Sequence, residues 1–331
     1  MSSFPGFIDL QVNGCAGFDV NNPEELSVEN IFKMTEYQWR QGVIRWFPTI
    51  ISNSDEAIKH ILRVIAEARK KDSLIEYSIP GVHLEIYVAE EAKGVHNPDY
   101  LRYPKWEFIQ RLPSELKEIV KIITLAPELP NATRFIKAAR ERGIVIALGH
   151  TLANQEIIIK ACLSGATLST HLGNGIPQKI DRHQNPIIFQ LANRSLSASF
   201  IADGYHVDLN ILKTFIQMKG VSRSIIVTDS ISAAGCPGGE YRLVDVKIIV
   251  RNGASYFVGT PYLAGSVTTM IKEFENLIYL CGFSWPEAIT MTFINPMNLM
   301  KLKMSSLVYC NFGKDHGLKI KSVKIKGKKV F

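Results

Sequence analysis

Short apolar runs rich in β-branched residues recur along the chain up to residue 229, and polar turn residues bound each run. Runs of this kind are typical of buried strands in a parallel sheet. The predicted strands are 7–13, 43–50, 79–85, 121–126, 144–149, 167–171, 197–202 and 224–229. Between them, apolar residues at helical spacing predict helices over 24–41, 54–71, 131–142, 154–164 and 208–219.

The alternation of strands with helices indicates the fold class. Strand–helix–strand units form parallel sheets, and eight such strands exceed the about five to seven of a usual doubly wound sheet. We therefore predict an α/β protein built on a (β/α)8 TIM barrel. No G-x-G-x-x-G or G-x-x-x-x-G-K segment follows a strand, which removes the main signals for a dinucleotide site or a P-loop.

The pattern changes after the eighth strand. Residues 239–257 alternate apolar and polar positions around Asn252-Gly253, which predicts a β-hairpin. The remaining predicted elements are helices over 264–281 and 285–300 and strand pieces over 305–331. We expect a barrel domain over 5–300, with the hairpin as an insertion, and a C-terminal β segment over 301–331.

Composition narrows the class of protein. Of 331 residues, 46% are hydrophobic and 21% are charged, a balance that excludes a disordered chain. No apolar run reaches the ~20 residues of a membrane helix, and the N-terminal segment lacks the regions of a secretory signal. We therefore expect a cytoplasmic protein with no membrane partner. The five cysteines include no C-x-x-C pair, which argues against a disulfide framework or a thiolate zinc site.

The net charge of +7 is concentrated in the C-terminal segment KIKSVKIKGKKVF. One interpretation is a nucleic-acid patch, and the other is the charged face of edge strands. Because the segment lacks interleaved aromatic residues, we expect no nucleic-acid partner. A positive field would also attract anionic small substrates.

Polar residues end most of the predicted strands. The carboxyl ends of barrel strands face the active site, and a polar side chain is costly to bury there without a partner. The residues concerned are Gln11, Asn13, Thr49, Glu85, Glu128, His150, His171, Asp203 with His206, and Asp229. Their recurrence at one end of the barrel predicts a functional site.

Glu85, His150 and His171 are candidate metal ligands. Two neutral imidazoles and a carboxylate are a common ligand set of catalytic zinc, which lowers the pKa of water toward ~7. Asp229 could take a proton from that water and pass it to a leaving amine. Each residue also has a structural interpretation: a histidine hydrogen-bonded in the core, Glu85 paired with Lys93, or Asp229 capping a helix.

A set of motifs along the chain matches one known family. The motifs are PGFIDLQVNG (5–14), PTIIS (48–52), GVHLE (81–85), KGVHNP (93–98), TLAPE (124–128), LGHTLAN (148–154), THLGNG (170–175), IADGYHV (201–207), VTDSISAAG (227–235), LAGS (263–266) and NP (295–296). In their order and spacing the chain resembles the N-acetylglucosamine-6-phosphate deacetylases of the amidohydrolase superfamily.

The resemblance implies a role for each matching residue. It implies Glu85, His150 and His171 as ligands of the catalytic metal, Asp229 as general base and acid, and His96 as the group that polarises the acetyl carbonyl. The substrate-binding residues it implies are His96, Asn174, Gly175, Arg182 and His206, with the phosphate on Asn174, Gly175 and Arg182. Family members can take a phosphate contact from the other subunit, which implies a homodimer.

Gln11 and Asn13 stand where most amidohydrolases carry the His-x-His of a second metal site. Amide oxygens are weak ligands beside imidazole, and the pattern is similar to a family branch that works with one metal. We therefore expect one divalent metal per subunit, Zn2+ in first place and Fe2+, Mn2+ or Co2+ as alternatives. Gln11 and Asn13 are expected to act in a second or water-mediated site at most.

The chain departs from the family pattern in three places. Ile86-Tyr87 replaces a Gly-Pro after Glu85, and His183-Gln184-Asn185 replaces Glu-Pro-Gly after Arg182, so both sides of the pocket are expected to differ. The printed sequence also starts at the first predicted barrel strand. We expect a reduced small β domain built mainly from the C-terminal tail, whose edge strands would need another partner such as a second subunit.

The leading hypothesis is metal-dependent hydrolysis of the acetamido group of N-acetylglucosamine 6-phosphate. The alternatives are a deacylase of another N-acylated amino sugar or sugar phosphate, and a non-catalytic sugar-binding barrel. The second alternative predicts the loss of a metal ligand or of the base, and neither residue is missing.

Overall fold

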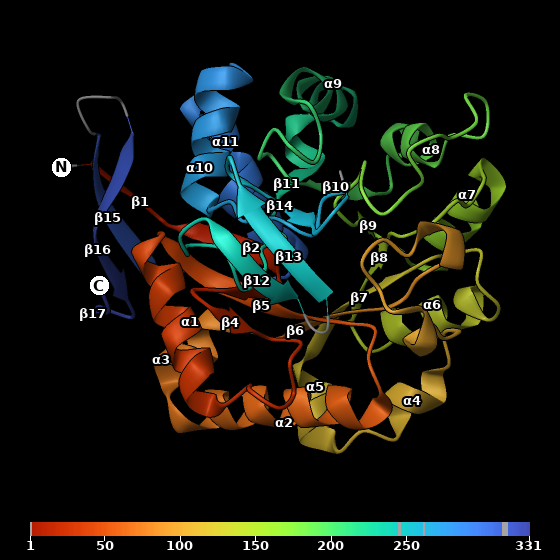
Figure 1. Ribbon diagram of the computed structural model, residues 1–331, viewed down its shortest axis with the longest axis horizontal. Coiled ribbons are helices and arrows are strands. Elements are labelled where there is room, and N and C mark those ends of the chain that lie inside the picture. Colours follow the sequence, from red (N-terminus) through yellow and green to blue (C-terminus); the bar gives the residue numbers. More distant parts are fainter. Residues whose placement is uncertain (1, 244–245, 261, 313–316) are drawn as a thin grey trace.

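An eight-stranded parallel sheet forms the centre of the computed structural model, which describes residues 2–243, 246–260, 262–312 and 317–331 (Figure 1). Its strands are β2 (Phe7–Val12), β5 (Val43–Ile51), β6 (Val82–Tyr87), β7 (Val120–Leu125), β8 (Val145–Leu148), β9 (Leu168–Ser169), β10 (Ser197–Phe200) and β11 (Ser224–Ile226). They pair in sequence order from β2 to β11, so the predicted barrel fold is confirmed.

The barrel closes at the carboxyl ends of its first and last strands. The backbone N–H of Asp229 donates to the carbonyl of Gln11 at 3.0 Å, and that of Asn13 donates to Ser230 at 2.8 Å. These two bonds join β2 to the segment that follows β11. The closure thereby places the predicted base beside the Gln-x-Asn segment.

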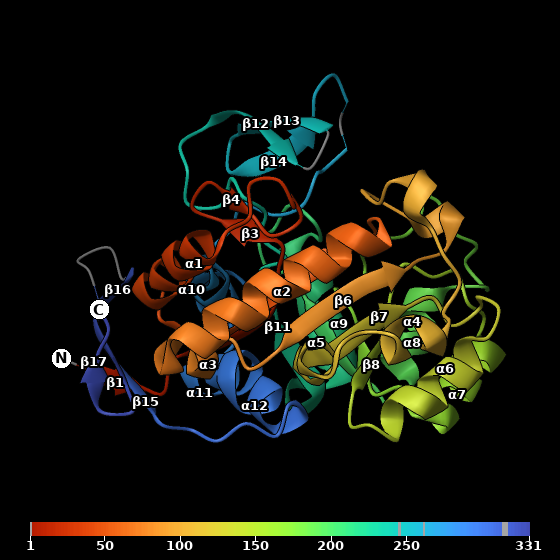
Figure 2. The ribbon, with the colours of Figure 1, turned by 90° about the horizontal axis from the view of Figure 1, so that it is seen from below.

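Helices surround the barrel (Figures 1 and 2). They are α1 (Val28–Arg40), α2 (Asp55–Lys71), α3 (Ser73–Ser78), α4 (Trp106–Gln110), α5 (Ser114–Ile119), α6 (Ala132–Arg140), α7 (Gln155–Ser164), α8 (Pro186–Ala192) and α9 (Leu209–Lys219). Helix α1 starts four residues later than predicted, because Ser27 caps it by accepting from the backbone N–H of Asn30 at 3.2 Å. Ser54 caps α2 and Asn154 caps α7 in the same way.

The segment after the insertion is less regular than predicted. It contains α10 (Met270–Glu275), α11 (Trp285–Ile289) and α12 (Asn295–Leu299), with π-helical turns at Asn276–Leu280 and Thr290–Ile294. The first helix begins at Met270 rather than at residue 264, because Thr269 accepts from the backbone N–H of Lys272 as its cap.

Three strands of the insertion form a separate antiparallel sheet over the mouth of the barrel (Figure 2). It consists of β12 (Gly239–Leu243), β13 (Val246–Arg251) and β14 (Ala254–Phe257). Asn252 and Gly253 turn the chain between β13 and β14 with φ values of 53° and 80°, as a tight hairpin requires. Leu243, Ile248 and Val250 form its buried face, against which Val95 packs.

The C-terminal strands are paired within the chain, which corrects one expectation. The sheet has the order β1-β15-β16-β17, with β1 (Ser2–Phe4), β15 (Ser306–Phe312), β16 (Leu318–Ile325) and β17 (Lys328–Lys329). Residues ahead of the first barrel strand therefore supply the partner of β15, and the first strand of the chain is not a barrel strand. The insertion sheet does not join this sheet. The domain division at residue 300 stays a prediction.

The basic tail has the alternation of a strand with one buried face. In β16, Val323 and Ile325 are buried, whereas Lys319, Lys321 and Lys324 are exposed. This agrees with the interpretation of the lysines as a solvated strand face. Within the part of the chain that the structure describes, no helix has both the length and the apolar content to cross a membrane.

Candidate active site

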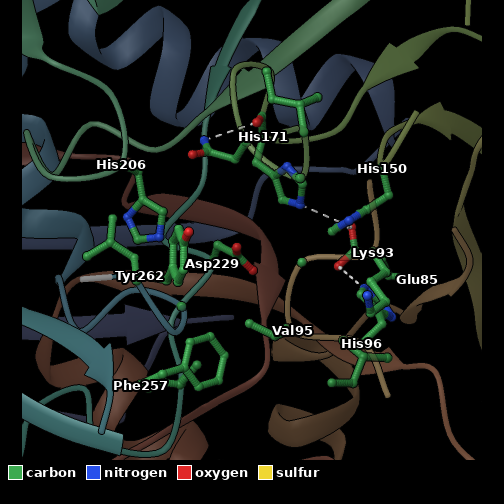
Figure 3. Close-up of a pocket in the computed structure, with 18 of the residues that line it drawn as sticks. Glu85, Lys93, Val95, His96, His150, His171, His206, Asp229, Phe257 and Tyr262 are labelled. Atoms are coloured by element: carbon green, nitrogen blue, oxygen red, sulfur yellow. Dashed lines mark hydrogen bonds and ion pairs between the residues drawn. The ribbon is translucent and has the colours of Figure 1, made fainter. Parts of the chain in front are cut away.

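A cavity of about 1070 Å³ opens at the carboxyl ends of the barrel strands. Figure 3 shows Glu85, His96 and His150 on one side of it and His206, Tyr262 and Phe257 on the other, with Asp229 between. The strand ends therefore bring together the carboxylates and imidazoles that the sequence singled out. Four of the predicted strand-end residues do not line the cavity: Gln11, Thr49, Glu128 and Asp203. Of these, Gln11 and Asp203 contact lining residues, Glu85 and His206 respectively.

Glu85 lies at the centre of the imidazole cluster. Its Oε1 atom is 3.5 Å from Nε2 of His150 and 3.3 Å from Nε2 of His171, and its Oε2 atom is 4.0 Å from Nε2 of His96. The four side chains are buried. The predicted ligand set Glu85, His150 and His171 thus converges on one point, and His96 stands beside it.

Three of these site residues have left-handed backbone conformations. His150, His171 and Asp229 have φ values of 51°, 28° and 48°. Such values are uncommon for residues other than glycine, and they persist only where the surrounding structure holds them. The backbone N–H of His171 donates to Oγ of Ser199 at 2.8 Å, and that of Asp229 donates to the carbonyl oxygen of Gln11 at 3.0 Å. The chain therefore turns sharply at each strand end and aims these side chains into the cavity.

The histidine rings are held by different kinds of partner. Nδ1 of His150 lies 2.8 Å from the carbonyl oxygen of Ala92, so this nitrogen carries the proton and Nε2 presents a lone pair. Nδ1 of His206 is fixed in the same way by Oδ2 of Asp203 at 2.7 Å. A metal-bound histidine usually has such a hydrogen bond on its other ring nitrogen, as His150 has here.

The donor set fits a divalent cation. In the described part of the chain, Oε1 of Glu85, Nδ1 of His171 and Nε2 of His96 are buried and have no hydrogen-bond partner. One ligand atom each from Glu85, His96 and His150 also lie within 4.8 Å of one another. A carboxylate with two or three imidazoles is a typical ligand set for zinc and related metals.

Gln11 and Asn13 bind the two carboxylates of the site. The side-chain amide of Gln11 donates to Oε2 of Glu85 at 3.2 Å, and that of Asn13 donates to Oδ1 of Asp229 at 2.7 Å. Both amides therefore present nitrogen, not oxygen, to the carboxylates. Their role in this structure is to hold those carboxylates in place.

Burial and charge shift the titration of the central groups in opposite directions. Burial opposes ionisation of Glu85, but His150 and His171 hold the pKa of Glu85 well below its ordinary value. Burial would lower the pKa of His171, but Glu85 outweighs it and raises that pKa to about 9. Burial raises the pKa of Asp229, although His171 opposes the shift, and burial lowers the pKa of His96 to about 3.

The substrate-binding residues expected from the sequence divide into two groups. Asn174, Gly175 and His206 line the cavity. Arg182 does not: it is exposed in the segment between β9 and α8, where its Nε donates to Nε2 of His183 at 3.2 Å. Among the described residues that line the cavity, Lys93 is the only lysine or arginine. The lysine or arginine that lines the cavity therefore comes from the segment before His96, not from the segment expected to hold a phosphate.

Several lining residues had no signal in the sequence. Tyr256, Phe257 and Tyr262 form an aromatic wall that the insertion and the segment after it bring over the barrel. The sequence around Tyr256 and Phe257 predicts only an ordinary hairpin, and Tyr262 lies beyond the predicted hairpin. By contrast, Ile86 and Tyr87 do not line the cavity: they continue β6 into the buried layer, where the Tyr87 ring packs on Phe135 at 5.1 Å between centroids.

Comparison with known proteins identifies the family. No protein-family model matches the chain. The N-acetylglucosamine-6-phosphate deacetylase of Haemophilus influenzae is 31% identical over 297 residues, which cover 88% of this chain and 75% of the relative. The chain belongs to the N-acetylglucosamine-6-phosphate deacetylase family.

Solved structures of deacetylases in this family share the whole fold. The enzyme of Pasteurella multocida superposes with a TM-score of 0.89 at 28% identity, over 99% of this chain and 86% of that one. A mutant of the Mycobacterium smegmatis enzyme, solved with N-acetyl-D-glucosamine-6-phosphate, has a TM-score of 0.89 at 25% identity, with the same coverage. The deacetylase resemblance of the sequence is thereby confirmed.

Proposed function

We propose that the protein hydrolyses the acetamido group of N-acetylglucosamine 6-phosphate to give glucosamine 6-phosphate and acetate. The observation that carries the proposal is the convergence of Glu85, His150 and His171 opposite Asp229 in one cavity. Deacetylases of the same fold and family support the choice of substrate.

One divalent metal per subunit, zinc in first place, is the cofactor we propose. Glu85, His150 and His171 would hold it, and the metal would supply Lewis acidity and a lowered pKa for water. Gln11 and Asn13 support a single metal, because their amide nitrogens already face the two carboxylates of the site. A preparation with two firmly bound metals per chain would contradict this count.

The chain's own residues would move the protons. Asp229 would accept a proton from the attacking water and deliver it to the amine as the carbon–nitrogen bond breaks. The Asn13 amide holds the Asp229 carboxylate at 2.7 Å, and burial raises the pKa of Asp229 above its ordinary value. His96 would donate a hydrogen bond to the acetyl carbonyl oxygen, and His206 would bind the sugar on the opposite side of the cavity.

A homodimer would complete the phosphate side of the cavity. Helices α7, α8 and α9 lie side by side, and each exposes large apolar side chains to solvent. Leu163 is 78% exposed, Ile211 50% and Met218 51%. Because exposed large apolar side chains that gather on one face are typical of an interaction surface, we propose that a second copy covers this face. Arg182 lies in the neighbouring exposed segment, where a partner could order it toward a phosphate.

The dimer is tested by light scattering on purified protein. Leu163→Glu and Ile211→Glu are expected to give monomers, whereas Lys70→Glu, an exposed change on α2, leaves the mass unchanged. A monomeric wild type would contradict the proposal. The cytoplasmic location expected from the sequence stays a prediction.

Acetate release decides the function. The substrate, its dephosphorylated form and its galacto analogue are compared in one assay, with metal content measured on the same sample. We expect the highest kcat/KM for the phosphorylated gluco compound. No acetate from any of the three compounds, with metal bound, would refute deacetylation, and equal rates with and without the phosphate would favour another N-acylated amino sugar.

A further inference from the structure

His96 is held on one side by a residue that none of the assigned roles uses. Ser52 directly follows strand β5, and it is buried, with 5% of its surface exposed. Its hydroxyl lies 2.9 Å from Nδ1 of His96, and its backbone N–H donates to the same nitrogen at 3.3 Å. One ring nitrogen therefore faces two groups of the same residue.

These two contacts decide which nitrogen of His96 carries the proton. A hydroxyl can donate or accept, but a backbone N–H can only donate. Nδ1 must therefore present its lone pair to Ser52. Because Nδ1 bears a lone pair, the ring carries a single proton, and that proton lies on Nε2. His96 lines the cavity, and its Nε2 atom has no hydrogen-bond partner among the described residues.

His150 is fixed in the opposite way. Its Nδ1 donates to the carbonyl oxygen of Ala92, so its Nε2 bears a lone pair. The two rings are neighbours, with centroids 4.7 Å apart, and both Nε2 atoms face Glu85, at 3.5 and 4.0 Å. By distance alone both histidines qualify as metal ligands. The carbonyl of Ala92 leaves a lone pair on Nε2 of His150, whereas the backbone N–H of Ser52 leaves a proton on Nε2 of His96.

We propose that Ser52 is a positioning residue that holds His96 as the Nε2–H tautomer, so that His96 donates to the substrate carbonyl oxygen and takes no metal coordination position. The inference rests on the proposed deacetylation for the identity of the acceptor. It explains why a cluster of three histidines around Glu85 divides into two ligands and one hydrogen-bond donor.

The tautomer can be read without any activity. Full-length protein labelled with 15N at histidine is examined by NMR in its metal-free and zinc-loaded forms, and His96→Asn assigns the signal. We expect a protonated Nε2 and an unprotonated Nδ1 for His96 in both forms, and a zinc-dependent shift for Nε2 of His150. An Nδ1–H tautomer in His96, or a zinc-induced coordination shift at its Nε2, would overturn the proposal.

Kinetics test the role of Ser52. Ser52→Ala removes the hydroxyl but keeps the backbone N–H, so we expect about a tenfold loss of kcat, the size of one hydrogen bond, with KM and zinc content near wild type. Ser52→Thr restores the hydroxyl and is expected to recover most of kcat. Ser54→Ala, which removes the cap of α2 two residues away, should lower stability without lowering kcat.

The outcomes separate this inference from the proposed function. A wild-type kcat in Ser52→Ala, or an equal loss in Ser54→Ala, would show that Ser52 has only a structural role. If wild-type protein releases no acetate, the proposed function fails, and the NMR experiment still decides the tautomer. If Ser52→Ala does not fold, Ser52→Thr and the wild-type spectrum decide the question.

Discussion

Gly175 is the position at which the smallest change should damage the metal centre. It has a φ of +61°, and a Cβ atom added there would lie 2.7 Å from Nδ1, 2.8 Å from Cε1 and 3.0 Å from Cγ of His150. Ordinary van der Waals contact begins near 3.4 Å, so the ring would have to move by about 0.7 Å. Metal–ligand distances tolerate only about 0.2 Å. The same shift would strain the hydrogen bond from His150 to Ala92.

We therefore expect Gly175→Ala to lose about 10- to 100-fold in zinc affinity, the usual effect of disturbing the support of a metal ligand. That range corresponds to about 1.4–2.8 kcal/mol of binding free energy. The left-handed backbone adds a separate cost of about 1 kcal/mol to the free energy of unfolding of the metal-free protein. Zinc affinity is measured by competition with a chromogenic chelator, and unfolding by urea titration of the metal-free protein.

Gly143→Ala is the matched control. Its φ is +71°, and a Cβ atom there meets nothing within 4 Å. It should show the same loss of unfolding free energy as Gly175→Ala and a wild-type zinc affinity. If both variants bind zinc like the wild type, the contact with His150 does not position a metal ligand, and the proposed metal centre is in doubt.

Three further changes test other parts of the structure. Asp229→Asn should keep its zinc and lose nearly all turnover, and a near wild-type kcat would show that Asp229 is not the base. Burial and neighbouring carboxylates raise the pKa of Glu273 well above its ordinary 4.5, so its stabilising contribution is complete below pH 4.5 and is lost as the pH rises through the raised value. Urea titrations at a series of pH values should thus show the unfolding free energy of Glu273→Gln rising relative to that of the wild type as the pH increases. A constant difference between the two proteins would contradict the raised pKa. The buried ammonium of Lys219 donates to the carbonyls of Gln190 at 2.8 Å and Asn193 at 2.7 Å. Lys219→Met should therefore lower the free energy of unfolding by about 2–3 kcal/mol. A change near zero would show that these bonds are not stabilising.

The barrel was predictable because its signals are local. Each strand is a short apolar run whose residues are almost all buried, as in β5 and β6. The five helices predicted between barrel strands were right to within four residues, and the errors lie at caps such as Ser27, where one side chain moves the boundary. The short helices α3, α4, α5 and α8 were not predicted. The polar residues at the strand ends were visible for the same reason, since the fold sends every strand end to one mouth.

Other parts could not be predicted, because they depend on residues far apart in the chain. The pairing of Ser2–Phe4 with β15 joins the two ends of the sequence, and no local sequence pattern predicts this pairing. The aromatic wall came from the insertion, whose alternation predicts a hairpin but not the surface on which the hairpin rests. Arg182 is a residue for which the sequence predicted a contact that the single chain does not make. The family resemblance implies that Arg182 binds a phosphate, but in the fold of this chain its side chain is exposed to solvent.

The histidines show most clearly what the sequence alone does not determine. Residue order alone predicted that Glu85, His150 and His171 belong to one site, since each ends or directly follows a predicted barrel strand, and the family resemblance added His96. It could not say which nitrogen of each ring bears the proton. That depends on the N–H of Ser52 and the carbonyl of Ala92, which lie 44 and 58 positions from the rings that they contact. A backbone group has the same chemistry at every position, so only the folded arrangement can make one imidazole a ligand and its neighbour a donor.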